Sequence, residues 1–324
     1  MQSQFEHISV MPTEIISTAP RLVDDGYLVI DCTTGGGGHL DLLINNLECS
    51  KTKFIGIDQD KDALLHLRSK FSERILTGSV IIEESDFGSI ADVCAKNNVV
   101  GKVDYIYADL GVSSHQLDTG ARGFSIHTEA ELDMRMNTSQ DLTAKDIINH
   151  WTEEDIANTI YKYGDEPMSR RIARAIVARR ESSPINTTTE LAEIVKSACH
   201  YKTHSKRHPA IKTFQAIRIA VNDELGQLEK LLNDGFEMLK PGGRMAIITF
   251  HSLEDRLVKQ KFKALSGRLK KDNTPFRHLP MAPDEPEKVF AKIVKPFPML
   301  PSKEEVAKNR RSRSAKLRGI EKLN

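Results

Sequence analysis

Short apolar runs alternate with amphipathic stretches over the first third of the chain. Residues 27–31, 53–58, 80–87 and 103–111 are strand-like, and helical patterns lie between them. Strands that alternate with helices form a parallel sheet covered by helices. A further strand is predicted at residues 244–250, after the turn sequence KPGG. The pattern therefore predicts an α/β fold with a mostly parallel sheet.

The interval between the fourth and fifth predicted strands is about 130 residues long, whereas a crossover usually needs only a few tens. Its pattern is mostly helical, and residues 169–180 alternate apolar positions with arginines, as in a helix with one buried face. We expect residues 115–213 to form a helical subdomain inserted after the fourth strand. Residues 1–114 and 214–324 would then form one discontinuous sheet domain.

The segment TFQAIRIAVNDELGQLEKLL, residues 213–232, carries an apolar stripe with helical spacing. The stripe consists of Phe214, Ile217, Val221, Leu225 and Leu228. We expect one long helix here, which returns the chain to the sheet. The remaining residues would complete the sheet and end in a basic tail, residues 308–318.

Four consecutive glycines, Gly35 to Gly38, follow the first predicted strand and precede a helical pattern. A glycine turn between a strand and a helix brings backbone amides close to a nucleotide-like ligand. The dinucleotide motif G-x-G-x-x-G does not fit, because Leu40 or Asp41 occupies the position of its last glycine. A phosphate-binding P-loop does not fit either, since His39 and Leu40 stand where Lys and Ser or Thr are needed.

Asp58 ends the second predicted strand, about 20 residues after the glycines, where a carboxylate can accept hydrogen bonds from both ribose hydroxyls of an adenosine. A glycine turn with a ribose-binding acid but no phosphate-binding residues suits S-adenosylmethionine, which has a ribose and an adenine but no phosphate. The alternative is a tight turn without a ligand. We therefore expect S-adenosylmethionine as the cofactor.

The composition is that of an ordinary globular protein. The chain has 324 residues, more than a usual single domain, with 39% hydrophobic and 28% charged residues. No apolar run reaches membrane-spanning length, and the start, MQSQFEHISV, lacks the basic and apolar regions of a signal peptide. We expect a cytoplasmic protein without membrane contact. The four cysteines form no C-x-x-C pair, so we expect no metal site and no disulfide.

The 46 basic and 45 acidic residues nearly balance, but the basic ones gather in three runs. The first lies on residues 170–180, the second on residues 202–212 and the third, the densest, on residues 308–318. Such runs on a nearly neutral chain favour local contact with a polyanion such as RNA or DNA. A solvated helix face would explain any one of them equally well.

Eight segments spread over nearly the whole chain resemble one family of proteins. They are, in order, IDCTTGGGGHL, FIGIDQD, ADLGVSSHQLD, RGFS followed by LDMRM, YGDE with RRIARAIV, HPAIKTFQAIRIAVNDEL, GGRMAIITFHSLEDRLVK and RSRSAKLR. The family, called MraW or RsmH, consists of bacterial S-adenosylmethionine-dependent methyltransferases that modify the exocyclic N4 of a cytosine in small-subunit ribosomal RNA. The resemblance implies a Rossmann-like class I methyltransferase fold, and 16S ribosomal RNA or the small ribosomal subunit as the partner. It also implies a target cytosine in the decoding region.

The resemblance further implies seven cofactor-binding residues, which are Gly37, Gly38, His39, Asp58, Phe87, Asp109 and Gln116. Gly37 and Gly38 would let the backbone approach the methionine end of the cofactor. Phe87 would lie along the adenine, or else pack in the core. The alternatives for the two polar residues are a first-turn helix position for His39 and a turn cap for Asp109.

The exocyclic amine of cytosine is a poor nucleophile because its lone pair is delocalised into the ring, so a hydrogen-bond acceptor near it is needed. Asp109 is the candidate catalytic acceptor. DNA amino-methyltransferases commonly carry Asp-Pro-Pro-Tyr at this place, whereas here the sequence is Asp-Leu-Gly-Val, so Asp109 could instead only orient the cofactor. Methylation of carbon 5 would need a cysteine after Pro or Thr, and none of the four cysteines has this setting.

The segment HSLED, residues 251–255, follows the fifth predicted strand. Ser252 together with Asp255 matches a helix N-cap with a first-turn acid. This leaves His251 and Glu254 as candidates for substrate contact.

Arg218 and Asn222 lie one helical turn apart, on a face that would be either solvated or in contact with RNA. The target base must leave any stack to reach the methyl group, so we expect single-stranded RNA or a flipped-out base. The helical insertion and the basic tail would hold that RNA.

Two other functions compete with this interpretation. One is a methyltransferase for a small molecule or a protein, with the insertion as a lid, and the arginine runs argue against a small apolar substrate. The other is a ribosome-assembly or RNA-binding protein that keeps a cofactor pocket without turnover, and the glycine loop, Asp58 and Asp109 argue against it. The sequence leaves the oligomeric state open, with a dimer as one option.

Overall fold

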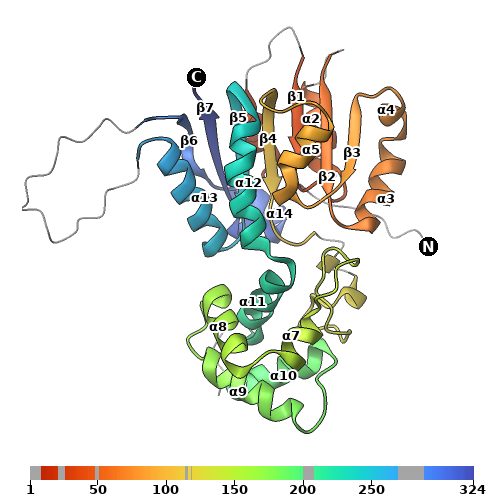
Figure 1. Ribbon diagram of the computed structural model, residues 1–324, viewed down its shortest axis with the longest axis vertical. Coiled ribbons are helices and arrows are strands. Elements are labelled where there is room, and N and C mark those ends of the chain that lie inside the picture. Colours follow the sequence, from red (N-terminus) through yellow and green to blue (C-terminus); the bar gives the residue numbers. More distant parts are fainter. Residues whose placement is uncertain are drawn as a thin grey trace, which may run out of the picture. The chain divides into compact units, whose positions relative to one another are not determined.

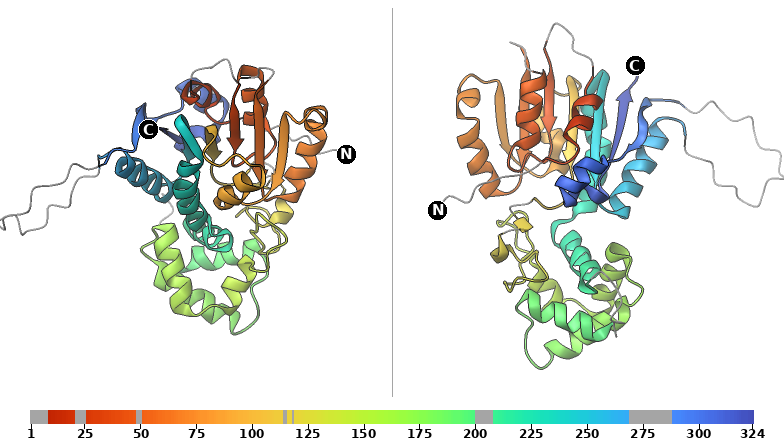
Figure 2. Two further views of the ribbon diagram at one scale, coloured as in Figure 1. Left: turned by 45° about the horizontal axis from the view of Figure 1, so that its top comes forward. Right: turned by 180° about the vertical axis from the view of Figure 1, so that it is seen from behind.

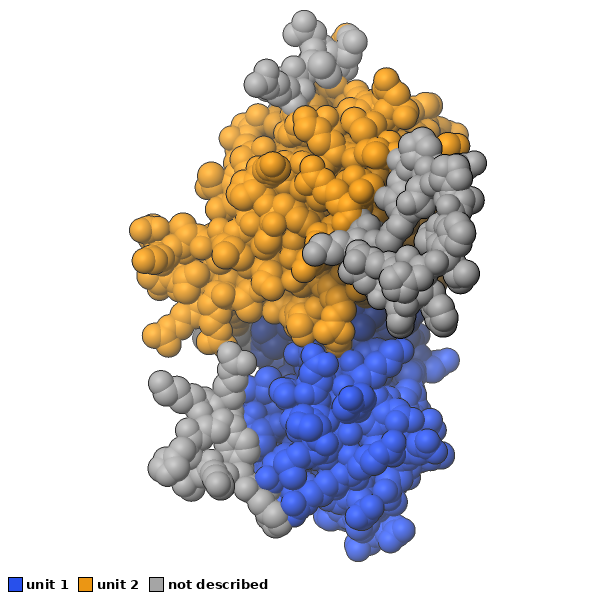
Figure 3. Space-filling view, turned by 90° about the vertical axis from the view of Figure 1, so that its left-hand side faces the viewer, with its two compact units in different colours: residues 1–5, 112–225 blue, residues 6–111, 226–324 orange. Residues whose placement is uncertain are grey.

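The computed structural model describes residues 9–20, 26–47, 51–113, 116–117, 119–199, 208–268 and 288–324. These residues form two compact units, which are coloured separately in Figure 3. Unit 1 contains the described residues of 112–225, and unit 2 contains those of 6–111 and 226–324. The expected insertion, residues 115–213, lies within the limits of unit 1, but that unit continues beyond it to Leu225.

Unit 2 is built on one seven-stranded sheet with the strand order β3-β2-β1-β4-β5-β7-β6 (Figure 1). The strands are β1 (Leu28–Asp31), β2 (Lys53–Asp58), β3 (Val80–Glu84), β4 (Val103–Asp109), β5 (Leu239–Thr249), β6 (Ala291–Met299) and β7 (Lys316–Lys322). Strands β1 to β5 pair in parallel, and β7 runs antiparallel to both β5 and β6. The predicted α/β fold with a mostly parallel sheet is confirmed.

The central strands are apolar on both faces because helices cover both sides of the sheet. In β4, Ile106 and Ala108 belong to one hydrophobic core, whereas Tyr105 and Tyr107 belong to the other. Helices α5, α12 and α13 complete the first core, and α1, α2 and α3 complete the second (Figures 1 and 2). These six helices and the short helix α4 have the following bounds: α1 (Pro12–Thr18), α2 (Gly38–Leu47), α3 (Lys61–Lys70), α4 (Ser72–Leu76), α5 (Ile90–Lys96), α12 (Glu224–Met238) and α13 (Ser252–Leu265).

The expected basic tail is not a free tail. It contains the end of α14 (Lys303–Lys308), the 3-10 helix η3 (Arg310–Ser314) and the start of β7, which lies inside the sheet between β5 and β6. Arg318 in β7 is only 4% exposed, donates to Asp255 Oδ1 at 2.8 Å, and lies 4.5 Å from the centre of the Phe297 ring. The expectation is therefore wrong for β7, because acidic and aromatic partners from distant parts of the chain allow its arginine to be buried.

Unit 1 is helical. Its helices are α7 (Ala144–His150), α8 (Glu153–Gly164), α9 (Ser169–Arg180), α10 (Thr188–Ala198) and α11 (Ala210–Asn222), preceded by the 3-10 helix η2 (Gly120–Arg122). As predicted, α9 buries Ile172 and Ile176 and exposes Arg170 and Arg174. None of the helices in the described part of the chain has the length and apolarity needed to cross a membrane.

The expected single helix over residues 213–232 is instead two helices, α11 and α12. Asp223 between them has a left-handed backbone, with φ 46° and ψ 39°, which ends α11. Phe214 and Val221 lie in the core of unit 1, whereas Leu228 lies in a core of unit 2. The prediction of one helix is wrong because the apolar stripe, continuous in the sequence, serves two separate cores.

Candidate functional site

Three adjacent strands of unit 2 each end on an aspartate. These are Asp58 in β2, Asp31 in β1 and Asp109 in β4. The chain order reverses between β1 and β4, because β2 lies beyond β1 on one side and β5 lies beyond β4 on the other. Ligands of open α/β sheets bind outside the carboxyl ends of the strands at such a point. The candidate site therefore lies where β1 and β4 end.

The glycine loop after β1 is held by Asp58 and by its own packing. The N–H of Gly35, which has φ 51°, donates to Asp58 Oδ2 at 2.7 Å. Gly37 has φ 73°, a value that residues with a side chain rarely adopt. A Cβ at Gly37 would lie 2.8 Å from Phe71 Cε2 and 2.9 Å from Leu67 Cδ2. Both the conformation and the packing of this loop therefore require glycine.

Asp58 holds the loop and still has acceptor sites for a ligand. Its Oδ1 accepts from the N–H of Asp60 at 2.9 Å, and its Oδ2 accepts from Gly35. Each carboxylate oxygen has a second lone pair, so ribose hydroxyls could also donate to Asp58. Burial raises the pKa of Asp58 to about 6, although these backbone hydrogen bonds act to lower it.

A buried pair, Asp31 and Tyr107, joins the ends of β1 and β4. Asp31 is 0% exposed and accepts from the N–H of Thr33 at 3.0 Å and from the hydroxyl of Tyr107. Burial raises the pKa of Asp31 to about 7. Burial and the neighbouring Asp31 also raise the pKa of Tyr107 well above its usual range. In the sequence, the one signal for this pair is an acid that ends an apolar strand.

Asp109 is the least satisfied of the three aspartates. Its backbone N–H donates to Thr33 Oγ1 at 2.7 Å. Its side chain is 13% exposed, and Oδ2 lies 3.7 Å from His39 Nδ1. Its Oδ1 is buried and finds no hydrogen-bond partner among the described residues. Burial, followed by the charge of nearby carboxylates, raises the pKa of Asp109 well above its usual range, as is common at functional sites.

His39, in the first turn of α2, is buried and oriented by the N-terminal segment. Its Nε2 lies 2.7 Å from the carbonyl oxygen of Val10, which can only accept, so Nε2 carries the hydrogen. The next residue, Met11, has a left-handed backbone with φ 52° and donates its N–H to Glu305 Oε1 at 2.7 Å. His39 thus connects α2 to Val10 and faces Asp109, and it is more than a first-turn polar residue.

The other predicted cofactor residues are distributed over both units. Gly38 is the first residue of α2. Phe87 begins the 3-10 helix η1 (Phe87–Ser89) after β3 and packs, half-buried, against the first core. Gln116 belongs to unit 1, where its side-chain oxygen accepts from the N–H of Ser113 at 3.0 Å. At the carboxyl edge of the sheet, unit 2 brings together Gly37, Gly38, His39, Asp58 and Asp109.

The N-cap of α13 is His251, so the prediction of Ser252 as the N-cap is wrong. The carboxylate of Glu254 accepts from the backbone N–H groups of Phe250, at 2.8 Å, and of His251, at 3.2 Å. Glu254 is 2% exposed and is occupied in capping this helix. Asp255 lies in the first turn of α13, as predicted, and accepts hydrogen bonds from two basic residues of β7.

Arg218 and Asn222 hold unit 1 together. Arg218 donates to the two carboxylate oxygens of Glu224, at 2.7 and 2.8 Å. Asn222 is 3% exposed, donates to the carbonyl oxygen of Met134 at 2.8 Å and accepts from the N–H of Met136 at 2.7 Å. Asn222 therefore lies on neither a solvated face nor an RNA-contacting face, because its buried side chain fixes a loop inside unit 1.

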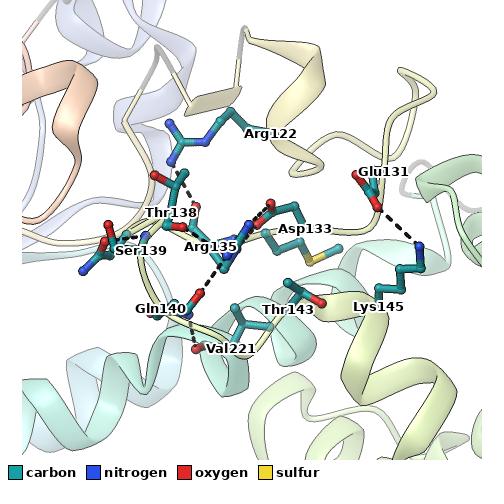
Figure 4. Close-up of polar contacts among 12 residues, drawn as sticks. Arg122, Glu131, Asp133, Arg135, Thr138, Ser139, Gln140, Thr143, Lys145 and Val221 are labelled. Carbon is teal, nitrogen blue, oxygen red and sulfur yellow. Dashed lines mark hydrogen bonds and ion pairs between the residues drawn. The ribbon is translucent and has the colours of Figure 1, made fainter.

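The arginine of the segment LDMRM shapes the same loop (Figure 4). The guanidinium of Arg135 forms two hydrogen bonds with Asp133, both at 2.8 Å. It also donates to the carbonyl oxygens of Thr138, at 3.0 Å, and Gln140, at 2.7 Å. Arg122 in turn donates to the carbonyl oxygen of Arg135 at 3.0 Å. This segment therefore has a structural role in unit 1.

Comparison with known proteins identifies the family to which this chain belongs. The family model of the MraW methylase family matches residues 4–323. A protein of Clostridioides difficile named Ribosomal RNA small subunit methyltransferase H is 43% identical over 321 residues, which cover 99% of this chain and 100% of that protein. Proteins of the same name from Lactobacillus johnsonii and Clostridium botulinum are 42% and 44% identical, with 99% of this chain and 100% of each protein covered. The chain belongs to the MraW methylase family.

Proposed function

We propose that this protein methylates the exocyclic N4 of a cytosine in the decoding region of small-subunit (16S) ribosomal RNA, with S-adenosylmethionine as the methyl donor. The observation that carries the proposal is the match, at 43% identity over 99% of the chain, to a relative named Ribosomal RNA small subunit methyltransferase H. Membership of the MraW methylase family agrees with methyl transfer.

The carboxyl edge of the sheet fits S-adenosylmethionine. The glycine loop offers backbone groups without the lysine of a phosphate-binding loop, and Asp58 retains acceptor sites for ribose hydroxyls. The buried Oδ1 of Asp109, unpartnered among the described residues, suits a cationic group. When bound, S-adenosylmethionine supplies an electrophilic methyl group on a positively charged sulfur. In this proposal Gly37, Gly38 and His39 line the methionine end of the cofactor. Phe87 contacts the adenine, and Gln116 is the remaining cofactor-binding residue that the family resemblance implies.

Asp109 is the proposed acceptor for the proton of the target amine. Cytosine N4 must lose one of its two hydrogens when it gains the methyl carbon, and an acceptor helps its lone pair to leave the ring system. Asp109 stands at the carboxyl end of β4, and its Oδ1 is not engaged by another described residue. As a carboxylate, it would accept a hydrogen bond from N4 and then the proton.

Exposed basic residues are the proposed RNA contacts. In the described part of the chain, they are Arg170, Arg171 and Arg174 of α9 and Arg310 and Arg313 of η3. Arg180 is excluded because its guanidinium donates to the carbonyl oxygens of Ile148, at 2.6 Å, and Trp151, at 2.7 Å. Lys202, Lys206 and Arg207 of the second basic run lie outside the described residues. We place the protein in the cytoplasm because its proposed substrate is there.

The test is incubation of the purified protein with methyl-labelled S-adenosylmethionine and either free 16S ribosomal RNA or assembled small subunits. The RNA is then digested to nucleosides and separated. We expect label in N4-methylcytidine, and a comparison of the two substrates identifies which one the enzyme uses. Label in a protein or small molecule would support the lid interpretation, and RNA binding without label would support an assembly factor. Either result without N4-methylcytidine would refute the proposal.

A further inference from the structure

The carboxyl group of Asp109 differs from those of Asp31 and Asp58. Asp31 accepts hydrogen bonds from Thr33 and Tyr107, and Asp58 accepts from two backbone N–H groups. By contrast, the Oδ1 of Asp109 is buried with no hydrogen-bond partner in the described part of the chain. A buried carboxylate without donors is costly, and such a group usually stays protonated instead.

Among the described residues, the surroundings of Asp109 supply no lysine or arginine to balance a carboxylate. The titratable groups near it are Asp31 in β1, His39 in α2, Glu254 in α13 and Glu305 in α14, and Tyr107 lies two positions before it on the same face of β4. Three of these are acids, and their charges raise the pKa of Asp109 further after burial has raised it. Among the described residues, no lysine or arginine forms an ion pair with Asp109. The free site is therefore short of positive charge at this position.

His39 directs Nδ1 toward Asp109, and in the neutral imidazole this nitrogen carries a lone pair. The carbonyl oxygen of Val10 accepts from Nε2 at 2.7 Å, so in a neutral imidazole the other nitrogen, Nδ1, is an acceptor. That Nδ1 lies 3.7 Å from Asp109 Oδ2. The arrangement suits a protonated Asp109, whose O–H can point toward Nδ1. A neutral His39 is thus a positioning residue that favours the neutral acid in the free protein.

We propose that Asp109 is a neutral acid in the free protein and ionises when the cofactor binds, becoming the counter-ion of a cationic group at the methionine end of S-adenosylmethionine. This inference rests on the proposed function. On binding, the O–H bond of the Asp109 carboxyl group breaks, the proton passes to the solvent buffer and the carboxylate remains beside the bound cation. Binding of the cofactor therefore also creates the carboxylate that the target amine requires.

The test is isothermal titration calorimetry of the full-length protein in two buffers with different ionisation enthalpies. At about pH 6 the α-amino group of the cofactor is already protonated, so its own titration does not interfere. The dependence of the measured enthalpy on the buffer gives the number of protons released. We expect about one proton for S-adenosylmethionine with the natural protein, and a loss of most of this release in Asp109→Asn, an isosteric variant whose folding is checked by thermal unfolding.

Three ligands identify the cation. S-adenosylmethionine carries a sulfonium and an ammonium, S-adenosylhomocysteine carries only the ammonium, and 5′-methylthioadenosine carries neither. Proton release with both S-adenosylmethionine and S-adenosylhomocysteine identifies the ammonium as the cation beside Asp109. Proton release with S-adenosylmethionine alone identifies the sulfonium, and either result supports the proposal. Equal release with 5′-methylthioadenosine, or equal release from Asp109→Asn, would overturn it.

The pH dependence of cofactor affinity provides a second test without a variant. Between the pKa of Asp109 in the complex and its higher pKa in the free protein, the Kd for S-adenosylmethionine should fall about tenfold for each pH unit of increase, because one proton is released per cofactor bound. Binding that shows neither proton release nor this dependence overturns the inference and leaves the proposed function standing. Failure of S-adenosylmethionine to bind at any pH overturns both.

Discussion

Replacement of Gly37 by alanine tests whether glycine is required at this position by the backbone conformation, by the close packing of neighbouring side chains, or by both. Gly37 and Gly78 have the same φ, 73°, but only at Gly37 would a Cβ meet other atoms, at 2.8 Å from Phe71 and 2.9 Å from Leu67. At Gly78 it would find nothing within 4 Å. A left-handed backbone costs a residue with a Cβ about 1–2 kcal/mol, and overpacking costs about 1–3 kcal/mol more.

We therefore expect Gly78→Ala to lower the free energy of unfolding by about 1–2 kcal/mol and Gly37→Ala to lower it by about 2–5 kcal/mol. Urea denaturation followed by circular dichroism measures both. Calorimetric titration with S-adenosylmethionine should show weaker binding for Gly37→Ala only, because Gly78 lies in the turn before β3 and away from the glycine loop. Equal destabilisation of the two variants would refute the packing argument. Unchanged cofactor affinity in Gly37→Ala would show that the glycine loop does not contribute to cofactor binding.

Three further predictions concern other parts of the chain. Truncation after Lys308 should give an unfolded or aggregated protein, since it removes β7 from between β5 and β6. Glutamate at Arg310 and Arg313 should instead preserve the fold and weaken RNA binding across a salt series. Asn222→Leu should lower the stability of unit 1 by about 1–3 kcal/mol in urea, because two buried backbone groups lose their partner. Burial raises the pKa of Asp31 from 3.8 to about 7, so folding binds a proton between these values. Stability should fall as the pH rises through this window, and Asp31→Asn should flatten that fall in thermal melts.

Each of these predictions can fail in a clear way. A truncated protein that melts cooperatively at the normal temperature would show that β7 is dispensable. An unchanged urea midpoint in Asn222→Leu would mean that the loop is held without this side chain. A melting temperature that depends on pH equally in Asp31→Asn and the natural protein would assign the effect to other groups.

The parallel part of the sheet follows from local patterns. Each of its strands is an apolar run bounded by polar or turn residues, and such a run needs no distant partner to be recognised. Asp58 and Asp109 could be found in the same way, because each ends such a run, and the carboxyl ends of parallel strands meet at one edge of the sheet. The glycine loop is also local, since Gly35 and Gly37 both have positive φ.

Other features depend on residues that are far apart in the sequence. The buried Arg318 of β7 needs Asp255, 63 positions away, and without that contact the basic segment resembles a solvated tail. The orientation of His39 depends on Val10, 29 positions away, and the Asp31 hydrogen bond depends on Tyr107, 76 positions away. Periodicity describes neighbours along one element, so it carries no information on such pairs.

By itself, the sequence determined the α/β class, the glycine loop with its strand-end acids, and the family of this protein. Only the tertiary structure decided that the helical stripe breaks at Asp223 to serve two cores and that β7 is internal. It also decided that Asp109 lies near acids and that its buried Oδ1 is unpartnered among the described residues. The physical reason is that burial and electrostatic surroundings arise when distant segments pack together. The charge state of Asp109, on which the proposed chemistry depends, is therefore a property of the folded site.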